Sequence, residues 1–223
     1  MDGEDFSIAD LKSTNGTFVN DVRVERQKLK DGDYLHIGNC ICRFLAGGNL
    51  EAQYHEEIHR LTIIDALTEI YNRRHLLERL SQELASSARY RRPLSLLLFD
   101  IDHFKAINDQ FGLLAGDFTL RELAGFIKKA IRQEDVFGRY GGEEFGLVMP
   151  ETSRPAALEC AERLRAMVQS HLFQFENRTY QITISLGVTD VTGDEWMTTR
   201  EMIRHADENL HLAKNNGRNR VTG

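Results

Sequence analysis

Apolar and polar positions recur with different periods along the chain, and from residue 65 onward they predict a domain of mixed helices and strands. Apolar runs bounded by turn residues predict strands over residues 94–102, 135–140, 144–149 and 180–188. Apolar positions at helical spacing predict helices over residues 75–90, 118–131, 155–171 and 199–215. These are the main elements of a predicted order α-β-α-α-β-β-α-β-α-β, which includes one further helix and one further strand and predicts an α+β sandwich with a mainly antiparallel sheet.

Residues 1–46 have a different pattern, of short strands separated by turns. Strands are predicted over residues 6–11, 17–19, 34–37 and 40–44. In the connector that follows, residues 47–64, apolar side chains recur at helical spacing at Leu50, Tyr54, Ile58 and Leu61. The connector therefore has two interpretations: a helix that pairs with a second copy of the chain, or a helix packed on its own domain.

Composition and charge exclude several classes of function. The chain has 223 residues and a formal net charge of −6, which argues against nucleic-acid binding through a general basic surface. No apolar run approaches membrane-spanning length and no secretory signal is visible, so a cytoplasmic location is expected. Cys40, Cys42 and Cys160 form neither a disulfide framework nor a metal motif, and we expect them to be packing thiols.

The segment Arg-Tyr-Gly-Gly-Glu-Glu-Phe at residues 139–145 is the most informative motif. Two glycines between strand-like runs predict a tight hairpin, in which glycine permits positive φ angles and leaves room for a ligand. Glu143 and Glu144 follow at once, so the turn places carboxylates where a hard cation and a phosphate chain could meet. The alternative interpretation is a solvated acidic turn.

A second pair of acids ends the apolar run 93–99. Asp100 and Asp102 would project to the same face of this strand, because side chains alternate along a strand. Carboxylates are rarely buried without a partner, so a buried strand that ends in two acids predicts a metal role. The alternative is a solvated strand end.

Three further polar residues follow that strand. Lys105 supplies a point charge suited to phosphate. Asn108 and Asp117 offer a carboxamide and a carboxylate, which together can satisfy the donors and acceptors of a guanine edge. Taken singly, Asn108 has the alternative interpretation of a loop or cap residue, and Asp117 that of a helix N-cap.

These motifs resemble, in order, those of the GGDEF-domain diguanylate cyclases. Residues 65–74 fit D-x-L-T-x-x-x-N-R-R, residues 99–117 fit F-D-x-D-x-F-K-x-x-N-D-x-x-G-x-x-x-G-D, and residues 139–145 fit R-Y-G-G-D/E-E-F. Residues 183–188 resemble the family's S-x-G-V strand, and residues 206–221 its closing A-D…A-K-x-x-G-R-N-x-V. The resemblance implies the palm-like, ferredoxin-related fold of the nucleotidyl cyclases.

The resemblance also implies a reaction, in which two GTP molecules become cyclic di-3′,5′-guanylate (cyclic di-GMP) and two pyrophosphates. Two domains would face each other as a homodimer. Asp100, the Ile101 carbonyl and Glu143 would hold two Mg²⁺ ions, which Mn²⁺ could replace. Glu144 would lie beside them, and with Asp100 and Glu143 it completes the predicted catalytic set.

Nucleotide contacts are implied in the same way. The triphosphate would be neutralised by Lys105, Lys214 and Arg218. Guanine would be bound by Asn108 and Asp117, with Leu67 lining the base pocket.

One position departs from the family pattern. Leu113 stands where the family usually has His after the glycine of F-G-H-x-x-G-D. This change leaves the metal and guanine positions intact, and it is the one feature that favours the alternative function of a non-catalytic GTP or cyclic di-GMP receptor.

A second nucleotide site is predicted at residues 132–135, which have the R-x-x-D spacing of the family's product-inhibition site. Arg132 would stack on a guanine of cyclic di-GMP and Asp135 would accept from a base edge. Arg163 lies where the family often supplies another arginine from a neighbouring domain. The alternative is surface charge at a helix end.

Residues 13–20 and 29–38 resemble the C-terminal half of a forkhead-associated (FHA) domain. Phosphothreonine binding in that family uses an arginine and a serine from the N-terminal half, so Asn15 alone does not predict phosphopeptide binding. We therefore expect three parts: an incomplete FHA-like β segment at 1–46, a helical linker at 47–64 and the cyclase domain at 65–223.

Overall fold

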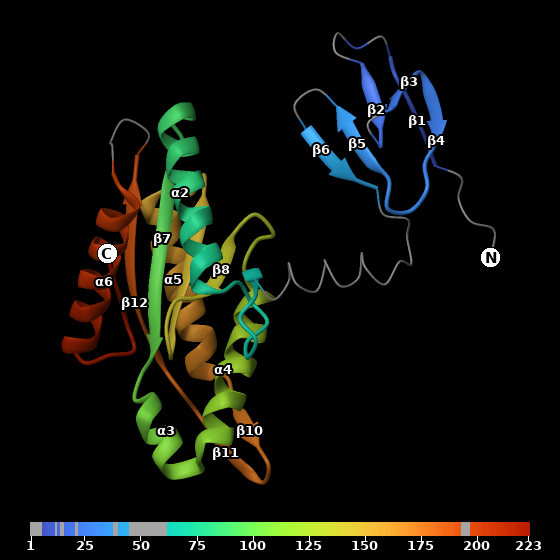
Figure 1. The fold of residues 1–223 in the computed structure, drawn as a ribbon. Helices are drawn as coiled ribbons and strands as arrows, with labels where there is room; N and C mark the ends of the chain where they lie inside the picture. Colours follow the sequence, from blue (N-terminus) through green and yellow to red (C-terminus); the bar gives the residue numbers. More distant parts are fainter. Residues whose placement is uncertain are drawn as a thin grey trace. The chain divides into compact units, whose positions relative to one another are not determined.

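The computed structural model describes residues 6–11, 13, 16–20, 22–37, 40–44, 62–192 and 197–223. The chain divides into two compact units, Met1–Thr62 and Ile63–Gly223 (Figure 1). The predicted connector at 47–64 lies outside the described residues up to residue 61. Among the helices described, none combines the length and the apolar character needed to cross a membrane.

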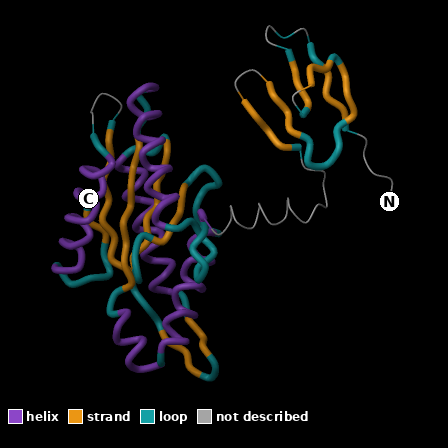
Figure 2. Tube along the Cα trace, viewed as in Figure 1, coloured by secondary structure: helices purple, strands orange, loops and turns teal. Residues whose placement is uncertain are grey.

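The first unit is built of short antiparallel strands (Figure 2). They are β1 (Ser7–Ala9), β2 (Thr17–Val19), β3 (Val22–Val24), β4 (Arg26–Lys28), β5 (Tyr34–Ile37) and β6 (Cys40–Arg43). β1 pairs with β4, and the other four form a sheet in the order β3-β2-β5-β6. The strands predicted near 7–9, 17–19, 34–37 and 40–43 are confirmed, whereas the short charged strands β3 and β4 were not predicted.

The second unit alternates helices and strands. Its helices are α2 (Arg73–Tyr90), α3 (Phe104–Phe111), α4 (Leu113–Lys128), α5 (Arg154–Ser170) and α6 (Thr199–Asn215). Its strands are β7 (Leu94–Ile101), β8 (Val136–Arg139), β9 (Glu144–Pro150), β10 (Phe173–Phe175), β11 (Arg178–Tyr180), β12 (Ile184–Val191) and β13 (Val221–Thr222).

The main sheet has the order β13-β12-β7-β9-β8, antiparallel except where β12 and β13 pair in parallel. β7 lies at its centre, and every residue of β7 is buried. Helices cover both faces (Figure 1). The predicted α+β sandwich around a mainly antiparallel sheet is therefore confirmed.

Alternation along β7 divides the apolar interior into two cores. Leu94, Leu96 and Leu98 pack with apolar side chains of α2 and α6. Leu97, Phe99 and Ile101 pack on the other face with side chains of α4 and α5. By the same alternation Asp100 belongs to the α2 and α6 face, at the end of the strand.

Polar side chains cap the N-terminal ends of α2 and α6. The Asn72 side chain accepts a hydrogen bond from the His75 N–H and caps α2. Thr198 and Glu201 form a reciprocal capping box at the start of α6. Both ends satisfy backbone N–H groups that a helix otherwise leaves without partners.

Two segments differ from the predictions. α4 begins at Leu113, not at residue 118, so it includes Gly116 and Asp117. Tyr180 belongs to the hairpin of β10 and β11, and the following strand runs over Ile184–Val191 in place of the predicted 180–188. β10 and β11 have only three residues each, which is too short for the alternation of a strand to be recognised in the sequence.

Gly187 allows α6 to pack directly against β12, and this contact gives a stability prediction. A Cβ at residue 187 would lie 2.1 Å from the Ala206 carbonyl oxygen and 2.3 Å from the Leu210 nitrogen. We expect Gly187→Ala to lower the free energy of unfolding by about 3 kcal/mol, because backbone atoms cannot easily give way. Urea unfolding followed by circular dichroism measures the change.

Gly125→Ala in α4 is the matched control. A Cβ at residue 125 meets no atom within 4 Å, and alanine favours a helix by roughly 1 kcal/mol over glycine, so this variant should be as stable as the parent or more so. Equal unfolding midpoints for Gly187→Ala and the parent chain would contradict the close approach of α6 and β12.

Candidate active site

The predicted hairpin joins β8 and β9, which pair with Arg139 opposite Phe145. The N–H groups of Tyr140 and Gly141 both donate to the Glu144 carbonyl oxygen, at 2.8 and 3.1 Å. Gly141 and Gly142 do not have positive φ, so that part of the prediction is wrong. A close steric contact exists at Gly141 but not at Gly142. A Cβ at Gly141 would lie 2.8 Å from Glu144 Oε2, and a Cβ at Gly142 would project into open space.

Arg139 holds this turn from inside. Its guanidinium donates to the carbonyl oxygens of Gly141 and Gly142, with the shortest distance 2.8 Å from Nη2 to Gly142 O. Its Nη1 lies 3.1 Å from Asp65 Oδ1. Burial alone would raise the pKa of Asp65, but the hydrogen bonds from Thr68 and the Arg139 charge outweigh it and hold the pKa below its ordinary value. The sequence analysis did not predict this ion pair, although Asp65 begins the motif at residues 65–74 and Arg139 begins the motif at residues 139–145.

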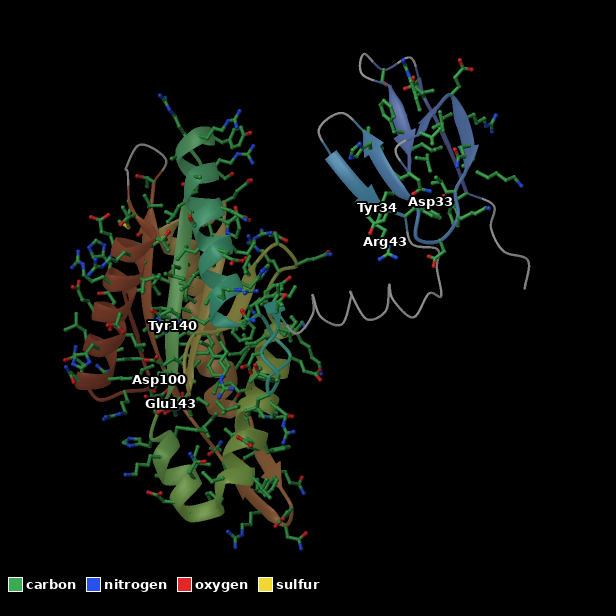
Figure 3. All side chains as sticks on the ribbon, in the orientation of Figure 1. Asp33, Tyr34, Arg43, Asp100, Tyr140 and Glu143 are labelled. Atoms are coloured by element: carbon green, nitrogen blue, oxygen red, sulfur yellow. The ribbon has the colours of Figure 1, made fainter. Side chains whose placement is uncertain are left out.

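Asp100 lies beside the acidic turn (Figure 3). It is opposite Glu144 in the β7–β9 register, and the next residue, Ile101, donates its N–H to the Glu143 carbonyl oxygen at 3.4 Å. Lys214 Nζ on α6 lies 2.8 Å from Asp100 Oδ2. The structure thus brings together Asp100, Ile101, Glu143, Glu144 and Lys214.

Electrostatics at Asp100 favour a bound cation. Asp100 is 6% exposed, and burial raises its pKa to about 6, with the charges of Glu143 and Glu144 acting in the same direction and Lys214 opposing them. The Lys214 ammonium is the positive charge now beside this carboxylate.

The donor set also suits a hard cation. No group of three or more His, Cys, Asp or Glu among the described residues is arranged as a metal site. Mg²⁺ needs only one or two carboxylates, because water and phosphate oxygens complete its shell. Asp100 and Glu143 therefore fit this metal chemically.

Asp102 does not share this environment. Its Oδ1 accepts from Ser185 Oγ at 2.7 Å, and its Oδ2 accepts from Thr183 Oγ1 at 2.7 Å and from the Asn219 N–H at 3.0 Å. Both oxygens of Asp102 therefore have protein partners, and the metal role predicted for Asp102 beside Asp100 stays a prediction. Its partners lie far along the chain, so no local signal could have revealed them.

Asn108 and Asp117 come from two consecutive helices. α3 ends and α4 begins at Gly112, whose φ of +87° turns the chain between them. The contact is close: a Cβ at Gly116 would lie 1.9 Å from Asn108 Oδ1. Both residues lie inside helices, so the interpretations as a loop residue and as an N-cap are wrong. Within the described residues, no hydrogen bond or ion pair engages either side chain, and both are half-buried.

The remaining predicted contacts surround these groups. Leu67 is half-buried and packs against the larger core. Lys105 is exposed in the first turn of α3, and Arg218 is exposed in the loop after α6. Leu113 begins α4 with 75% of its surface exposed, so its replacement of the usual His leaves the interior unchanged.

The R-x-x-D residues form a separate turn after α4. The Arg132 N–H donates to Asp135 Oδ2 at 2.9 Å, and burial raises the pKa of Asp135 above its ordinary value against this hydrogen bond. Arg132 and Asp135 line a cavity of about 430 Å³. Because α4 ends at Lys128, Arg132 is not in the last turn of that helix.

Arg163 reaches this turn from α5 of the same domain. It donates to the Ala130 carbonyl oxygen at 2.9 Å and contacts Cys160 Sγ, and its charge acts on Asp135. The supply of this arginine from a neighbouring domain stays a prediction. Of the predicted packing thiols, Cys160 is half-buried and Cys42 is exposed.

The pKa of Asp100 gives a prediction for the metal-free chain. Its folded pKa of about 6 lies above the ordinary value of 3.8, so between these pH values the folded chain binds more protons than the unfolded chain. The contribution of Asp100 to stability therefore falls as pH rises through this window. Asp100→Asn removes that dependence, and relative to the parent it should gain up to about 3 kcal/mol between roughly pH 4 and 7.

Urea unfolding in EDTA at several pH values measures this difference. Glu159→Gln, a neutralisation of an exposed acid on α5, serves as the control and should follow the parent. If the stability curves of Asp100→Asn and the parent run parallel, the raised pKa is refuted.

The comparisons with known proteins agree with this geometry. The family model described as "Diguanylate cyclase, GGDEF domain" matches residues 62–220, and the FHA domain model matches residues 1–38. Diguanylate cyclase DgcP of Pseudomonas aeruginosa is 42% identical over 74% of this chain and 24% of its own length. The chain spans less than half the length of the first curated relatives that it matches.

Solved structures show the same fold. The coiled coil and GGDEF domain of DgcB from Caulobacter crescentus, in complex with c-di-GMP, matches with a TM-score of 0.72 and 28% identity over 77% of this chain and 91% of that one. The active GGEEF domain of a diguanylate cyclase from Vibrio cholerae matches with a TM-score of 0.63 and 37% identity over 68% and 95%. Over residues 62–220, the chain belongs to the GGDEF-domain diguanylate cyclase family.

Proposed function

We propose that residues 65–223 form a diguanylate cyclase domain that condenses two GTP molecules into cyclic di-GMP and two pyrophosphates. In each half-reaction a 3′-hydroxyl oxygen bonds to the α-phosphorus of the GTP on the facing domain, the bond from that phosphorus to the pyrophosphate breaks, and the hydroxyl proton is released. The main support for this proposal is that Asp100, Glu143 and Lys214 come together at the end of β7, with Asn108 and Asp117 on the helices that follow.

Guanine binding is assigned to the crossing of α3 and α4. Asn108 presents a carboxamide and Asp117 a carboxylate, and within the described residues no hydrogen bond or ion pair engages either side chain. A carboxylate accepts from the guanine N1–H and exocyclic amine, which adenine does not offer in that arrangement. Leu67 supplies an apolar wall. This pair accounts for a preference for guanine over adenine.

Phosphate binding is assigned to Lys105, Lys214 and Arg218. They come from α3, from the end of α6 and from the loop after it. Lys105 and Arg218 are exposed, so both are open to a ligand, and Lys214 contacts Asp100 directly. Three cations match a triphosphate, whose charge needs neutralisation before the α-phosphorus can be attacked.

Asp100, the Ile101 carbonyl and Glu143 would hold divalent cations, and we propose two Mg²⁺ per site with Mn²⁺ as a substitute. Such ions supply charge neutralisation at the α-phosphate and lower the pKa of a bound hydroxyl. Asp100 must then release Lys214, whose ammonium becomes available to the triphosphate. Glu144 lies beside the site, opposite Asp100 in the β7–β9 register.

Regulation and organisation complete the proposal. A homodimer is required because each domain holds one GTP, and cyclic di-GMP bound at Arg132, Asp135 and Arg163 would inhibit the enzyme. Residues 1–46 would form an FHA-like β segment, and residues 47–64 would form a helical linker. Because GTP is a cytoplasmic nucleotide, the proposal implies a cytoplasmic location.

Product analysis tests the activity. The purified chain, freed of any bound cyclic dinucleotide, is incubated with GTP and Mg²⁺ at several protein concentrations. Cyclic di-GMP should form at a rate that rises faster than linearly with protein, since two domains must meet. Glu143→Gln should lower turnover at least about 100-fold, because a metal ligand loses its charge, and Glu159→Gln should leave turnover unchanged.

Two results would contradict the proposal. Intact GTP at every protein concentration would favour the receptor function that Leu113 suggested, provided that GTP still binds. Near-parent cyclisation by Glu143→Gln would remove Glu143 from the metal site.

Product inhibition has its own test. Arg132→Ala should raise the cyclic di-GMP concentration needed for half-inhibition at least about tenfold, because a stacked, charge-assisted contact to guanine is lost. Initial rates without added product should stay near those of the parent. Arg154→Ala, an exposed arginine at the start of α5, is the matched control. Unchanged inhibition of Arg132→Ala by added product would refute this second site.

A further inference from the structure

The loop after α6 has an unusual backbone. Gly217, Arg218 and Asn219 follow one another with φ angles of +108°, +59° and +47°. A left-handed conformation costs a residue other than glycine roughly 1–3 kcal/mol, and it persists only where surrounding contacts enforce it. Arg218, proposed above to bind the triphosphate, lies in the middle of this run.

Asp102 enforces the backbone from one side. It is 5% exposed, and its Oδ2 accepts from the Asn219 N–H at 3.0 Å. Hydrogen bonds from Thr183 and Ser185 on the neighbouring strand segment fix the orientation of this carboxylate. The Asp102 carboxylate, just after β7, is therefore held in one orientation and fixes the loop through the Asn219 N–H.

Arg165 enforces the same residue from the other side. Its Nη1 donates to Asn219 Oδ1 at 2.7 Å, and its Nε and Nη2 are bonded to the Glu162 carboxylate, with the shortest distance 2.7 Å. The Arg165 side chain is 15% exposed, so α5 presents an ordered guanidinium. Asn219 is therefore held at its backbone nitrogen and at its side-chain oxygen by two different elements.

Both ends of this loop are aligned with one strand. Lys214, just before the loop, contacts Asp100 at 2.8 Å, and Asn219, just after Arg218, contacts Asp102 at 3.0 Å. Asp100 lies in β7, and Asp102 is the first residue after the end of that strand. A displacement of the loop would move the cations away from the carboxylates together.

We propose that Asp102, Asn219 and Arg165 are positioning residues for nucleotide binding, which hold Arg218 and Lys214 toward the triphosphate. The inference rests on the proposed function and adds residues that touch neither GTP nor metal. Asparagine suits position 219 because it tolerates the left-handed conformation and supplies the acceptor that Arg165 needs. Aspartate supplies the same acceptor, whereas alanine supplies none.

Binding of two probes separates positioning from general damage. Calorimetry in Mg²⁺ would use α,β-methylene-GTP, which cannot be cyclised, and GMP, which lacks the β- and γ-phosphates. Asn219→Ala should weaken α,β-methylene-GTP at least about tenfold and GMP less than about twofold, because the lost order affects phosphate contacts. Asn219→Asp should restore most of the affinity for α,β-methylene-GTP.

Further variants guard against loss of folding. Arg165→Gln should reproduce the selective effect from α5, and Arg204→Ala, an exposed α6 residue paired with Glu208, should bind both probes as the parent does. Thermal unfolding verifies that each variant is folded. In turnover, the selective variants should raise KM more than they lower kcat.

Each contrary result has a distinct meaning. Parent-like affinity of Asn219→Ala for α,β-methylene-GTP, or an equal loss for both probes, would overturn the positioning role while leaving the proposed function intact. Failure of the parent chain to bind either probe would overturn the proposed function and this inference together.

Discussion

Burial of β7 on both faces is the constraint on which the rest of the cyclase domain depends. A strand without an exposed face is mostly apolar, and the alternation of its side chains builds two cores, one with α2 and α6 and one with α4 and α5. Such a strand also delivers whatever follows it to a fixed position. Here Asp100 is the penultimate residue of β7 and Asp102 follows the strand, so carboxylates stand at the boundary between core and solvent, where carboxylates are rarely buried.

The two acids meet this desolvation in opposite ways. Asp102 receives hydrogen bonds on both oxygens and becomes part of the framework. Asp100 has Lys214 beside it but also two other carboxylates, and its pKa is raised to about 6. A carboxylate that its own protein solvates incompletely is a place where external positive charge is bound favourably. At the end of β7, Asp102 is therefore fully hydrogen-bonded, whereas the carboxylate of Asp100 is only partly neutralised by Lys214.

Sequence reasoning predicted the features that depend on neighbouring residues and missed those that depend on distant ones. The apolar run of β7 and the capped helix α6 could be read locally. The start of α4 could not, because Gly116 disfavours a helix and Asp117 is typical of an N-cap, whereas the contact of Asn108 with Gly116 requires that helix. Likewise, the bonds from Arg139 to Asp65 and from Asn219 to Asp102 join residues 74 and 117 places apart. Sequence motifs contained all four residues but could not reveal the pairs.

The two adjacent glycines of the acidic turn differ in what a side chain at each position would contact. A Cβ at Gly141 would lie 2.8 Å from Glu144 Oε2, so a side chain at this position would require the end of the Glu144 side chain to move. Gly142 faces nothing within the described structure, so the folded chain alone places little steric restriction on it. A change at position 141 would therefore disturb Glu144 in the acidic turn, whereas a change at position 142 would meet no atom of the described structure. A requirement for glycine at position 142 would therefore have to come from the binding of a ligand, because packing within the folded chain does not impose one.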